Sequence, residues 1–471
     1  MRGRTNIPPR PTAIVNGTPT DFIVAKNEVI EVGDFVEFER TSGYQAIDNV
    51  IMNHVVHADV SDTLKVVSYT TVYSTTYNFK VSLIDVSTGT AKILDTYTFV
   101  RTKAQNSGGT TYEIRSTSVL VLDDGTIICG TSSVYTGDPL VVRLKVVDNK
   151  LVEAEKYIAQ YTINGVDNGS LVKLSNNRFV LVCGLKMVLF TYTTSALTYV
   201  REIVIPYLNK YVTAFCGCTS DGRIIMLTYN GSDEEYRWHH YFEMIKLDTS
   251  NNVSLLGYVD TGWSNSSSSG YAYKVHYAKP LADDGVIVFT RQNTLSSAVK
   301  THTMLSITFD TTNIYIGTTT TIKDVFKDVY PTVTSLTEEY FRMYRISANT
   351  FVTAVRTGSL YMYGIVNVDN TSFSLLTNVV TFAYQANIST YPITDIIAFH
   401  YDDYLYVIGR GYIDSSETLN QLKFKHTAGD NYIEVGEDTV YVKKYKGGKS
   451  LGFAKTGGTS GEMIKVYVPI V

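Results

Sequence analysis

The part of the sequence with the most reactive side chains is the run Asp233-Glu234-Glu235-Tyr236-Arg237-Trp238-His239-His240. Carboxylates and imidazoles are metal ligands, and an aromatic ring beside them could stack on a sugar. Neighbouring side chains on a β-strand point to opposite faces of the sheet, so His239 and His240 would not converge on one ligand. A solvated strand edge is therefore the favoured interpretation, and a metal or sugar site is the alternative.

Two Asp-Asp-Gly triplets, Asp123-Asp124-Gly125 and Asp283-Asp284-Gly285, raise the question of calcium binding. Carboxylate oxygens are the ligands that Ca²⁺ prefers. Asp and Gly are also ordinary residues of tight turns, because they tolerate the backbone conformations that a chain reversal needs. The turn interpretation is favoured for both triplets.

Tyrosines gather toward the end of the chain, and an aromatic platform of this kind could bind a sugar. Tyrosine also simply favours β-strands, which is the preferred interpretation. The tyrosines in question are Tyr361, Tyr363, Tyr384, Tyr391, Tyr404 and Tyr406.

Motifs of known catalytic machinery do not occur in the sequence. The chain has no Gly-x-Ser-x-Gly elbow, no His-Glu-x-x-His, no phosphate-binding Gly-x-x-x-x-Gly-Lys-Ser/Thr loop and no dinucleotide fingerprint. The turns also lack the tryptophan of sialidase repeats, since Trp238 and Trp263 are the two tryptophans present. We therefore predict a protein that is not an enzyme and uses neither cofactor nor metal. A propeller enzyme with a dispersed active site is the alternative.

Composition favours a large, soluble, nearly all-β protein. Of 471 residues, 44% are hydrophobic and 18% are charged, and 36 are tyrosine. Residues that suit a pleated sheet dominate, whereas long stretches with helical periodicity are absent. A net charge of −4 gives no electrostatic basis for nucleic-acid binding, and no apolar run is long enough to span a membrane. We expect neither nucleic acid nor membrane among the partners.

A short pattern recurs through the chain: a polar turn, one variable residue, then an apolar β-branched or aromatic run. Asp123-Asp124-Gly125, Thr126 and Ile127-Ile128-Cys129 are the clearest copy. Each copy predicts a hairpin. Seven copies occur, spaced on average about 57 residues apart, which indicates a repeat architecture. Their apolar runs begin at or near Leu64, Ile127, Phe179, Ile224, Ile287, Phe351 and Leu405.

Four antiparallel strands can be traced in most repeats, which predicts a seven-bladed β-propeller over residues 44–426. The seventh unit, which ends near His426, lacks a separate fourth strand. We expect a segment between Glu37 and Asn53 to complete it and so close the ring. Outside the propeller, residues 1–20 are predicted to be an extended arm. Residues 21–43 and 427–471 are predicted to form the two parts of a small β domain.

Two terminal segments carry a family resemblance. The first is Ile30-Glu31-Val32-Gly33-Asp34-Phe35-Val36; the second begins Leu451-Gly452-Phe453-Ala454 and continues from Gly457 to Val468. Together they resemble the small β domain of tailed-bacteriophage capsid decoration and head-fibre proteins, in which these halves lie close in sequence. Here about 390 residues separate them, as expected for a propeller inserted at closely spaced chain ends. The implied fold is an all-β, seven-bladed propeller inserted into a small β-barrel-like anchoring domain built from both termini.

This resemblance implies a non-enzymatic structural protein of the virion, made in the cytoplasm of the host bacterium. The terminal β domain would bind the major capsid protein or other virion proteins, with homo-oligomers on the capsid, and the propeller would project outward. The residues expected to anchor the chain lie in the basic N-terminal arm, in the terminal β domain and in its lysine-rich turn. They are Arg4, Pro8, Pro9, Arg10, Phe35, Lys443, Lys444, Lys446 and Phe453.

A second hypothesis from a different class is a glycan- or receptor-binding propeller in a phage adhesion, tail or fibre protein. It would attach the particle to a host through a cell-surface glycan. The candidate ligand-binding residues are Trp238, His239 and Tyr404.

Overall fold

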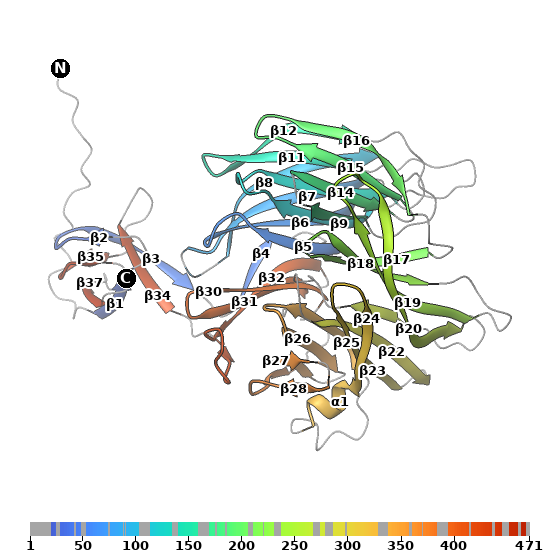
Figure 1. The fold of residues 1–471 in the computed structure, drawn as a ribbon. Helices are drawn as coiled ribbons and strands as arrows, with labels where there is room; N and C mark the ends of the chain where they lie inside the picture. Colours follow the sequence, from blue (N-terminus) through green and yellow to red (C-terminus); the bar gives the residue numbers. More distant parts are fainter. Residues whose placement is uncertain are drawn as a thin grey trace. The chain divides into compact units, whose positions relative to one another are not determined.

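The structure is a computed structural model of the whole chain (Figure 1). It describes residues 20–24, 29–41, 44–48, 53–73, 76–87, 89, 91–102, 114–133, 140–158, 169–174, 177–183, 186–205, 211–219, 221–229, 237–266, 274–277, 286–296, 299–327, 338–357, 360–369, 371–383, 394–413, 416–435, 439–444, 452–459 and 463–467. Backbone contacts divide the chain into two compact units. Unit 1 comprises Met1–Gly43, Val86–Ala91 and Gly436–Val471, and unit 2 comprises Tyr44–Asp85 and Lys92–Val435.

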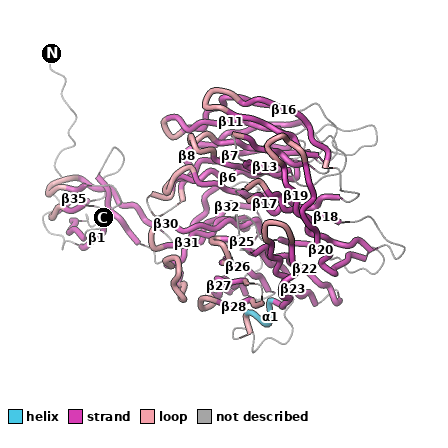
Figure 2. Tube along the Cα trace, in the orientation of Figure 1, coloured by secondary structure: helices cyan, strands magenta, loops and turns pink. Residues whose placement is uncertain are grey.

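Unit 2 is built from seven antiparallel sheets, called blades I to VII in chain order (Figures 1 and 2). Blade I contains β5 (Asn53–Asp59), β6 (Leu64–Tyr73), β7 (Thr76–Asp85) and β8 (Lys92–Thr102); blade II contains β9 (Ile114–Val121), β10 (Ile127–Ser133), β11 (Leu140–Val147) and β12 (Lys150–Ile158). Blade III contains β13 (Gly169–Leu174), β14 (Arg178–Cys183), β15 (Lys186–Tyr192) and β16 (Leu197–Val204); blade IV contains β17 (Tyr211–Cys218), β18 (Arg223–Tyr229), β19 (Arg237–Leu247) and β20 (Val253–Ser266).

The remaining blades follow the same plan. Blade V contains β21 (Lys274–Tyr277), β22 (Val286–Ser296), β23 (Val299–Phe309) and β24 (Ile314–Thr321), and the four-residue helix α1 (Ile322–Val325) follows it. Blade VI contains β25 (Glu338–Arg345), β26 (Thr350–Thr357), β27 (Leu360–Val368), β28 (Phe373–Leu375) and β29 (Val380–Ala383). Blade VII contains β30 (Thr394–Tyr401), β31 (Tyr404–Ile413), β32 (Ser416–Lys425), β33 (Glu434–Val435) and the distant β4 (Tyr44–Asp48). The seven-bladed β-propeller predicted from the repeat is confirmed.

The recurring polar turn joins the first strand to the second in six of the seven blades. Gly125 and Gly222 have φ values of 77° and 86°, and Asn177 and Asp402 have 54° and 52°. These residue types tolerate positive φ at low cost, so each turn can reverse the chain tightly. Six of the seven predicted turns lie at this place between described strands, and Asp283-Asp284-Gly285 lies outside the described residues.

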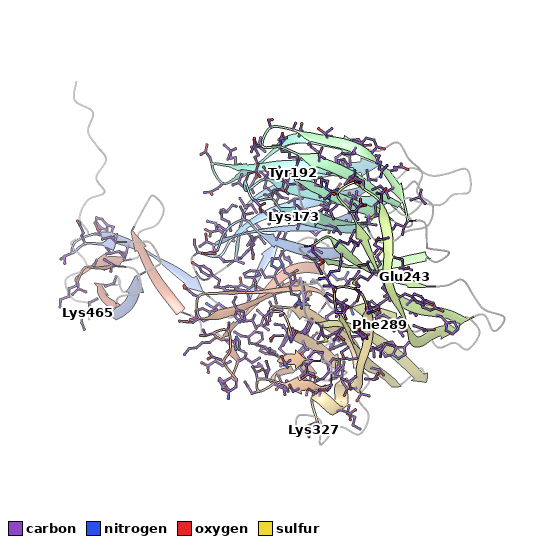
Figure 3. All side chains as sticks on the ribbon, viewed as in Figure 1. Lys173, Tyr192, Glu243, Phe289, Lys327 and Lys465 are labelled. Atoms are coloured by element: carbon purple, nitrogen blue, oxygen red, sulfur yellow. The ribbon has the colours of Figure 1, made fainter. Side chains whose placement is uncertain are left out.

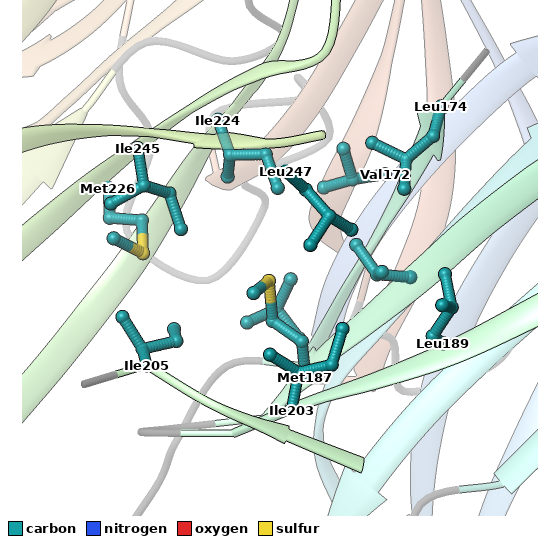
Figure 4. Close-up of a cluster of buried hydrophobic side chains, with 12 residues drawn as sticks. Val172, Leu174, Met187, Leu189, Ile203, Ile205, Ile224, Met226, Ile245 and Leu247 are labelled. Carbon is teal, nitrogen blue, oxygen red and sulfur yellow. The ribbon is translucent and has the colours of Figure 1, made fainter. Parts of the chain in front are cut away.

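Apolar side chains fill the space between neighbouring blades. Figure 3 draws the described side chains on the ribbon. One such cluster joins blade III to blade IV (Figure 4). Burying a single aliphatic side chain of this size contributes about 1.5–3 kcal/mol, so the stacking of blades is the main stabilising contact. The cluster contains Val172, Leu174, Val180, Val182, Met187, Leu189, Ile203 and Ile205 from blade III, and Ile224, Met226, Ile245 and Leu247 from blade IV.

Blade VII closes the ring with strands from both ends of the propeller. β32 pairs with β33 through Phe424 and Lys425, and with β4 through residues 419–422, where Gln421 faces Gln45 and Asn420 faces Ala46. The predicted closing segment between Glu37 and Asn53 is therefore confirmed as β4. Closure of this kind covers an edge of β32 that would otherwise be free to pair with another chain.

Strands from both termini meet in unit 1. β1 (Thr20–Val24), β34 (Thr439–Lys444), β3 (Phe35–Thr41), β35 (Gly452–Ala454) and β37 (Met463–Tyr467) form a closed barrel in that order. β2 (Val29–Ile30) pairs with β36 (Gly458–Thr459) beside it. Val36, Ala454 and Val466 of the barrel and Ile30 of β2 are buried.

Candidate functional site

The segments that carry the family resemblance pair with each other in unit 1. Phe35 faces Phe453, and Ile30 faces Gly458. Gly33, with a φ of 96°, donates its backbone N–H to the carbonyl of Ala454, and Ala454 donates to the carbonyl of Asp34. The first segment therefore adds to the second as neighbouring strands of one small β structure.

Local polar contacts hold the turn between β2 and β3. The Asp34 carboxylate accepts the backbone N–H of Glu31 at 2.9 Å, and the Asp34 N–H donates to the Glu31 carbonyl at 3.0 Å. At Gly457 a side chain has no room, because a Cβ there would lie 2.8 Å from the carbonyl oxygen of Ile30. The hydrogen bonds of Asp34 explain the aspartate in the first segment, and the lack of space at Gly457 explains the glycine in the second.

Apolar side chains are exposed beside this turn. Val29 is 59% exposed and Val32 is 70% exposed, whereas Ile30 between them is buried. Exposed valines cost little singly, but two of them on one short β structure give it an apolar surface that a partner could bury. Val29 and Val32 were not among the predicted anchoring residues. The signal in the sequence was the period of two along β2, which places Val29 opposite to the buried Ile30.

The structure describes four of the nine predicted anchoring residues. Phe35 is half-buried in β3, and Phe453 lies in β35. Lys443 and Lys444 lie in β34, where they face Glu37 and Val36 of β3. The structure thus brings four predicted residues onto adjoining strands. Arg4, Pro8, Pro9, Arg10 and Lys446 lie outside the described residues.

The predicted ligand-binding residues of the propeller do not come together. Trp238 and His239 lie at the start of β19, the third strand of blade IV, where they face Asn265 and Ser264. Tyr404 begins β31, the second strand of blade VII. In an antiparallel blade, second and third strands start at opposite ends of the sheet, so these residues lie at opposite rims of the propeller. Tyr404 also lies under the Lys423 ammonium, with 4.2 Å between Nζ and the ring centroid.

The other residues considered for chemistry have structural surroundings where they are described. Asp124 accepts the backbone N–H of Thr126 at 3.0 Å, and Asp123 accepts from Nζ of Lys173 at 2.6 Å; Lys173 is labelled in Figure 3. Hydrogen bonds from Thr126 and the charge of Arg143 lower the pKa of Asp124 against the opposing effect of desolvation. Turn formation therefore accounts for these carboxylates.

The tyrosines near the end of the chain are either buried or outside the described residues, apart from Tyr404. Tyr361, Tyr363 and Tyr406 are fully buried, so they form core rather than a platform for a ligand. Tyr384 and Tyr391 lie outside the described residues. His239 is half-exposed and His240 is buried, which agrees with the alternation expected of a strand.

No group of three or more His, Cys, Asp or Glu side chains among the described residues is placed to hold a metal ion. No helix in the described part of the chain is long and apolar enough to cross a membrane.

The sequence matches no protein-family model and no curated protein. Solved structures with a similar fold include the β-propeller domain of Nup133 from Vanderwaltozyma polyspora, at 8% identity and a TM-score of 0.39 over 85% of this chain and 99% of that one. Polysaccharide lyase Uly1 is similar at 9% identity and a TM-score of 0.42, covering 82% and 99%. A protein from Lactobacillus plantarum is similar at 9% and 0.44, covering 78% and 93%. At this level the likeness concerns the propeller fold, and it decides neither for nor against an enzyme.

Proposed function

We propose that the chain is a non-enzymatic structural protein of a tailed-bacteriophage virion, which decorates the capsid through unit 1 and displays the propeller. The observation that carries the proposal is the pairing of the two terminal segments. They resemble two halves of a small decoration domain, about 390 residues apart here, and they lie on adjoining strands. An insertion that leaves the host domain intact requires such pairing.

Binding would bury the apolar surface formed by Val29 and Val32 against capsid protein. The backbone around it is held by the Gly33–Ala454 and Asp34–Glu31 hydrogen bonds, so little conformational entropy would be lost on binding. Phe35, Phe453, Lys443 and Lys444 would contribute from the adjoining strands, and the N-terminal arm would extend the contact. No bond-making step is involved.

The test is a pair of matched single substitutions in the full chain. Val32→Glu places a charge on the proposed contact surface, and Val204→Glu does the same on the outer strand β16 of blade III, where Val204 is 62% exposed. Each protein is mixed with capsids of the encoding phage that lack the decoration, and bound protein is measured by co-sedimentation. Burying an unpaired carboxylate should weaken binding about tenfold or more for Val32→Glu.

The control variant should bind as the unmodified chain does. Equal binding by all three proteins would show that the surface around Val32 is not the contact. Failure of the unmodified chain to bind any capsid would contradict the proposed function itself.

A further inference from the structure

Three histidine side chains, His57, His400 and His426, lie in the contacts that close the propeller ring. We call the contacts of blade VII with blades VI and I, together with the contacts within blade VII that hold its chain ends, the seam. His57 of β5 in blade I is hydrogen-bonded through Nδ1 to the hydroxyl of Tyr344 in blade VI, at 2.7 Å. This bond joins the two blades that flank blade VII, so it fixes the seam from both sides.

Blade VII is held against His57 by an aromatic ring. Phe399 of β30 lies 5.5 Å from the His57 ring, centroid to centroid, and the Lys65 ammonium lies 5.2 Å from the Phe399 centroid. Lys65 is itself bound to Asp59 at 2.8 Å. The charged groups that face His57 are therefore Asp59 on its own strand and Lys65 on the next one.

A second pair of rings holds the chain as it leaves blade VII. His400 Nε2 and His426 Nδ1 are 2.8 Å apart, and His426 Nε2 lies 3.1 Å from the carbonyl oxygen of Asp430. A carbonyl only accepts, so His426 carries its proton on Nε2 and accepts from His400 through Nδ1. Around His426, Asp403 accepts its backbone N–H, and the carboxylates of Asp403 and Asp430 accept from Thr427.

We propose that the seam is released by acid: protonation of His57 and of His400 frees blade VII while the other blades keep their fold. In a protonated His57 both ring nitrogens carry hydrogen, so Nδ1 can only donate and the Tyr344 hydroxyl would have to turn to accept. Each new charge would lie on a ring that burial keeps from water, where desolvation of the charged form is unfavourable; at His57, Asp59 offsets part of this cost. The proposal concerns proton binding by the propeller and does not depend on what unit 1 binds.

Electrostatics of the folded chain agrees with this geometry. Burial, partly offset by Asp59 and reinforced by Lys65, lowers the pKa of His57 to about 4. Burial and the neighbouring His426 lower the pKa of His400 to about 4 as well. Both rings are therefore neutral near neutral pH, and both would take up protons more readily in an opened seam, where histidine returns to about 6.5.

Hydrogen exchange read by mass spectrometry tests the proposal on the full chain. Peptides that cover β4 and β32 report on the seam, and peptides that cover β14 and β15 of blade III report on the rest of the ring. Between about pH 7.5 and about pH 5, after correction for intrinsic exchange, seam protection should fall about 25-fold for each of the two histidines. Protection in blade III, and the fluorescence of the buried Trp263 in blade IV, should not change over this interval.

Substitution of the histidines should remove the effect. His57→Asn keeps an acceptor near the position of Nδ1, His400→Gln keeps a donor near the position of Nε2, and neither residue titrates. The double variant should lose the acid-dependent fall in seam protection, whereas the control His239→Asn, at a half-exposed position of blade IV, should retain it. An unchanged fall in the double variant would overturn the proposal, as would a seam in the unmodified chain that stays as protected as blade III.

A second variant covers the case in which the double variant does not fold. Ala46→Cys with Asn420→Cys would link β4 to β32 at facing positions. Oxidised, this variant should show no acid-dependent loss of protection in β4, and reduction should restore the loss. A loss that persists in the oxidised protein would overturn the proposal.

Discussion

The joints between consecutive blades II to V differ chemically from the seam. Arg143 of blade II, Arg178 of blade III and Arg223 of blade IV each donate to a backbone carbonyl in the outer turn of the following blade, at Thr194, Asp248 and Asp310. At the seam the His57–Tyr344 hydrogen bond joins two neutral groups, and the charged Lys65 lies over the Phe399 ring.

Neutral links at the seam include an amide as well as imidazoles. Asn378 of blade VI accepts the backbone N–H of Ile433 at 2.7 Å and donates to its carbonyl at 2.9 Å. Arginine stays charged at any pH that a protein meets, whereas imidazole changes charge between about pH 4 and about pH 7. Blades II to V are therefore joined by a group whose charge does not change with pH, whereas the seam contains imidazoles whose charge does.

The largest expected effect comes from breaking the seam's backbone pairing. Ala46→Pro removes a backbone donor from β4 opposite Asn420 and should lower the free energy of unfolding by about 3 kcal/mol or more. Ala46→Val keeps that donor and should stay within about 1 kcal/mol of the unmodified chain. Denaturant unfolding measures both, and equal stabilities would mean that β4 contributes little to closure.

Removing an arginine joint should have the next largest effect. Arg143 is 1% exposed, and it also binds Glu155 at 2.9 Å, so Arg143→Met would leave a carboxylate and the Thr194 carbonyl with one partner fewer. We expect a loss of about 2–3 kcal/mol that does not depend on pH between about 5 and 8. Arg201→Met removes an exposed bond to the Asn251 carbonyl and should cost less than about 1 kcal/mol. A loss of stability in Arg143→Met that depends on pH would contradict the difference in pH dependence between the arginine joints and the seam.

Removing one hydroxyl at the seam should have the smallest effect. Tyr344→Phe deletes the bond to His57 and should cost about 1 kcal/mol near neutral pH. Tyr315→Phe deletes an exposed bond to Asp310 and should cost less. Thermal unfolding of both variants provides the measurement.

The contribution of His57 to the stability of the folded chain depends on pH with a definite sign. The pKa of His57 in the folded chain is lowered to about 4, so its contribution is fully present above about pH 6.5 and is lost as pH falls through about 4. The unmodified chain should therefore lose stability over that interval relative to His57→Asn, whose side chain does not titrate, and thermal unfolding measures this difference. A difference that stays constant down to about pH 4 would show that His57 does not titrate at the seam.

Local and periodic features could be predicted from the sequence. The conformation of turns such as Asp123-Asp124-Gly125 could be predicted from their residue types. The recurrence of seven such turns predicted the seven blades. The interval that holds β4 followed from a missing strand in the last repeat. The register of β4 on β32 did not follow, because a short strand of five residues has no pattern that selects one register.

Contacts between distant residues could not be predicted in this way. His57 and Tyr344 are 287 positions apart, and neither stands in a motif. Their meeting depends on how many blades close the ring and on the angle between blades, which are properties of the whole fold. Exposure of Val29 and Val32 likewise depends on which strands cover unit 1, and the pairing of β2 with β36 decides that.

Cryo-electron microscopy of particles of the encoding phage tests the proposed function most directly. The account predicts ordered copies of the chain on the capsid lattice, with the barrel of β1, β3, β34, β35 and β37 against the major capsid protein and the propeller farther from the shell. Particles that lack the chain, or that carry it only on the tail or fibres, would contradict the proposal.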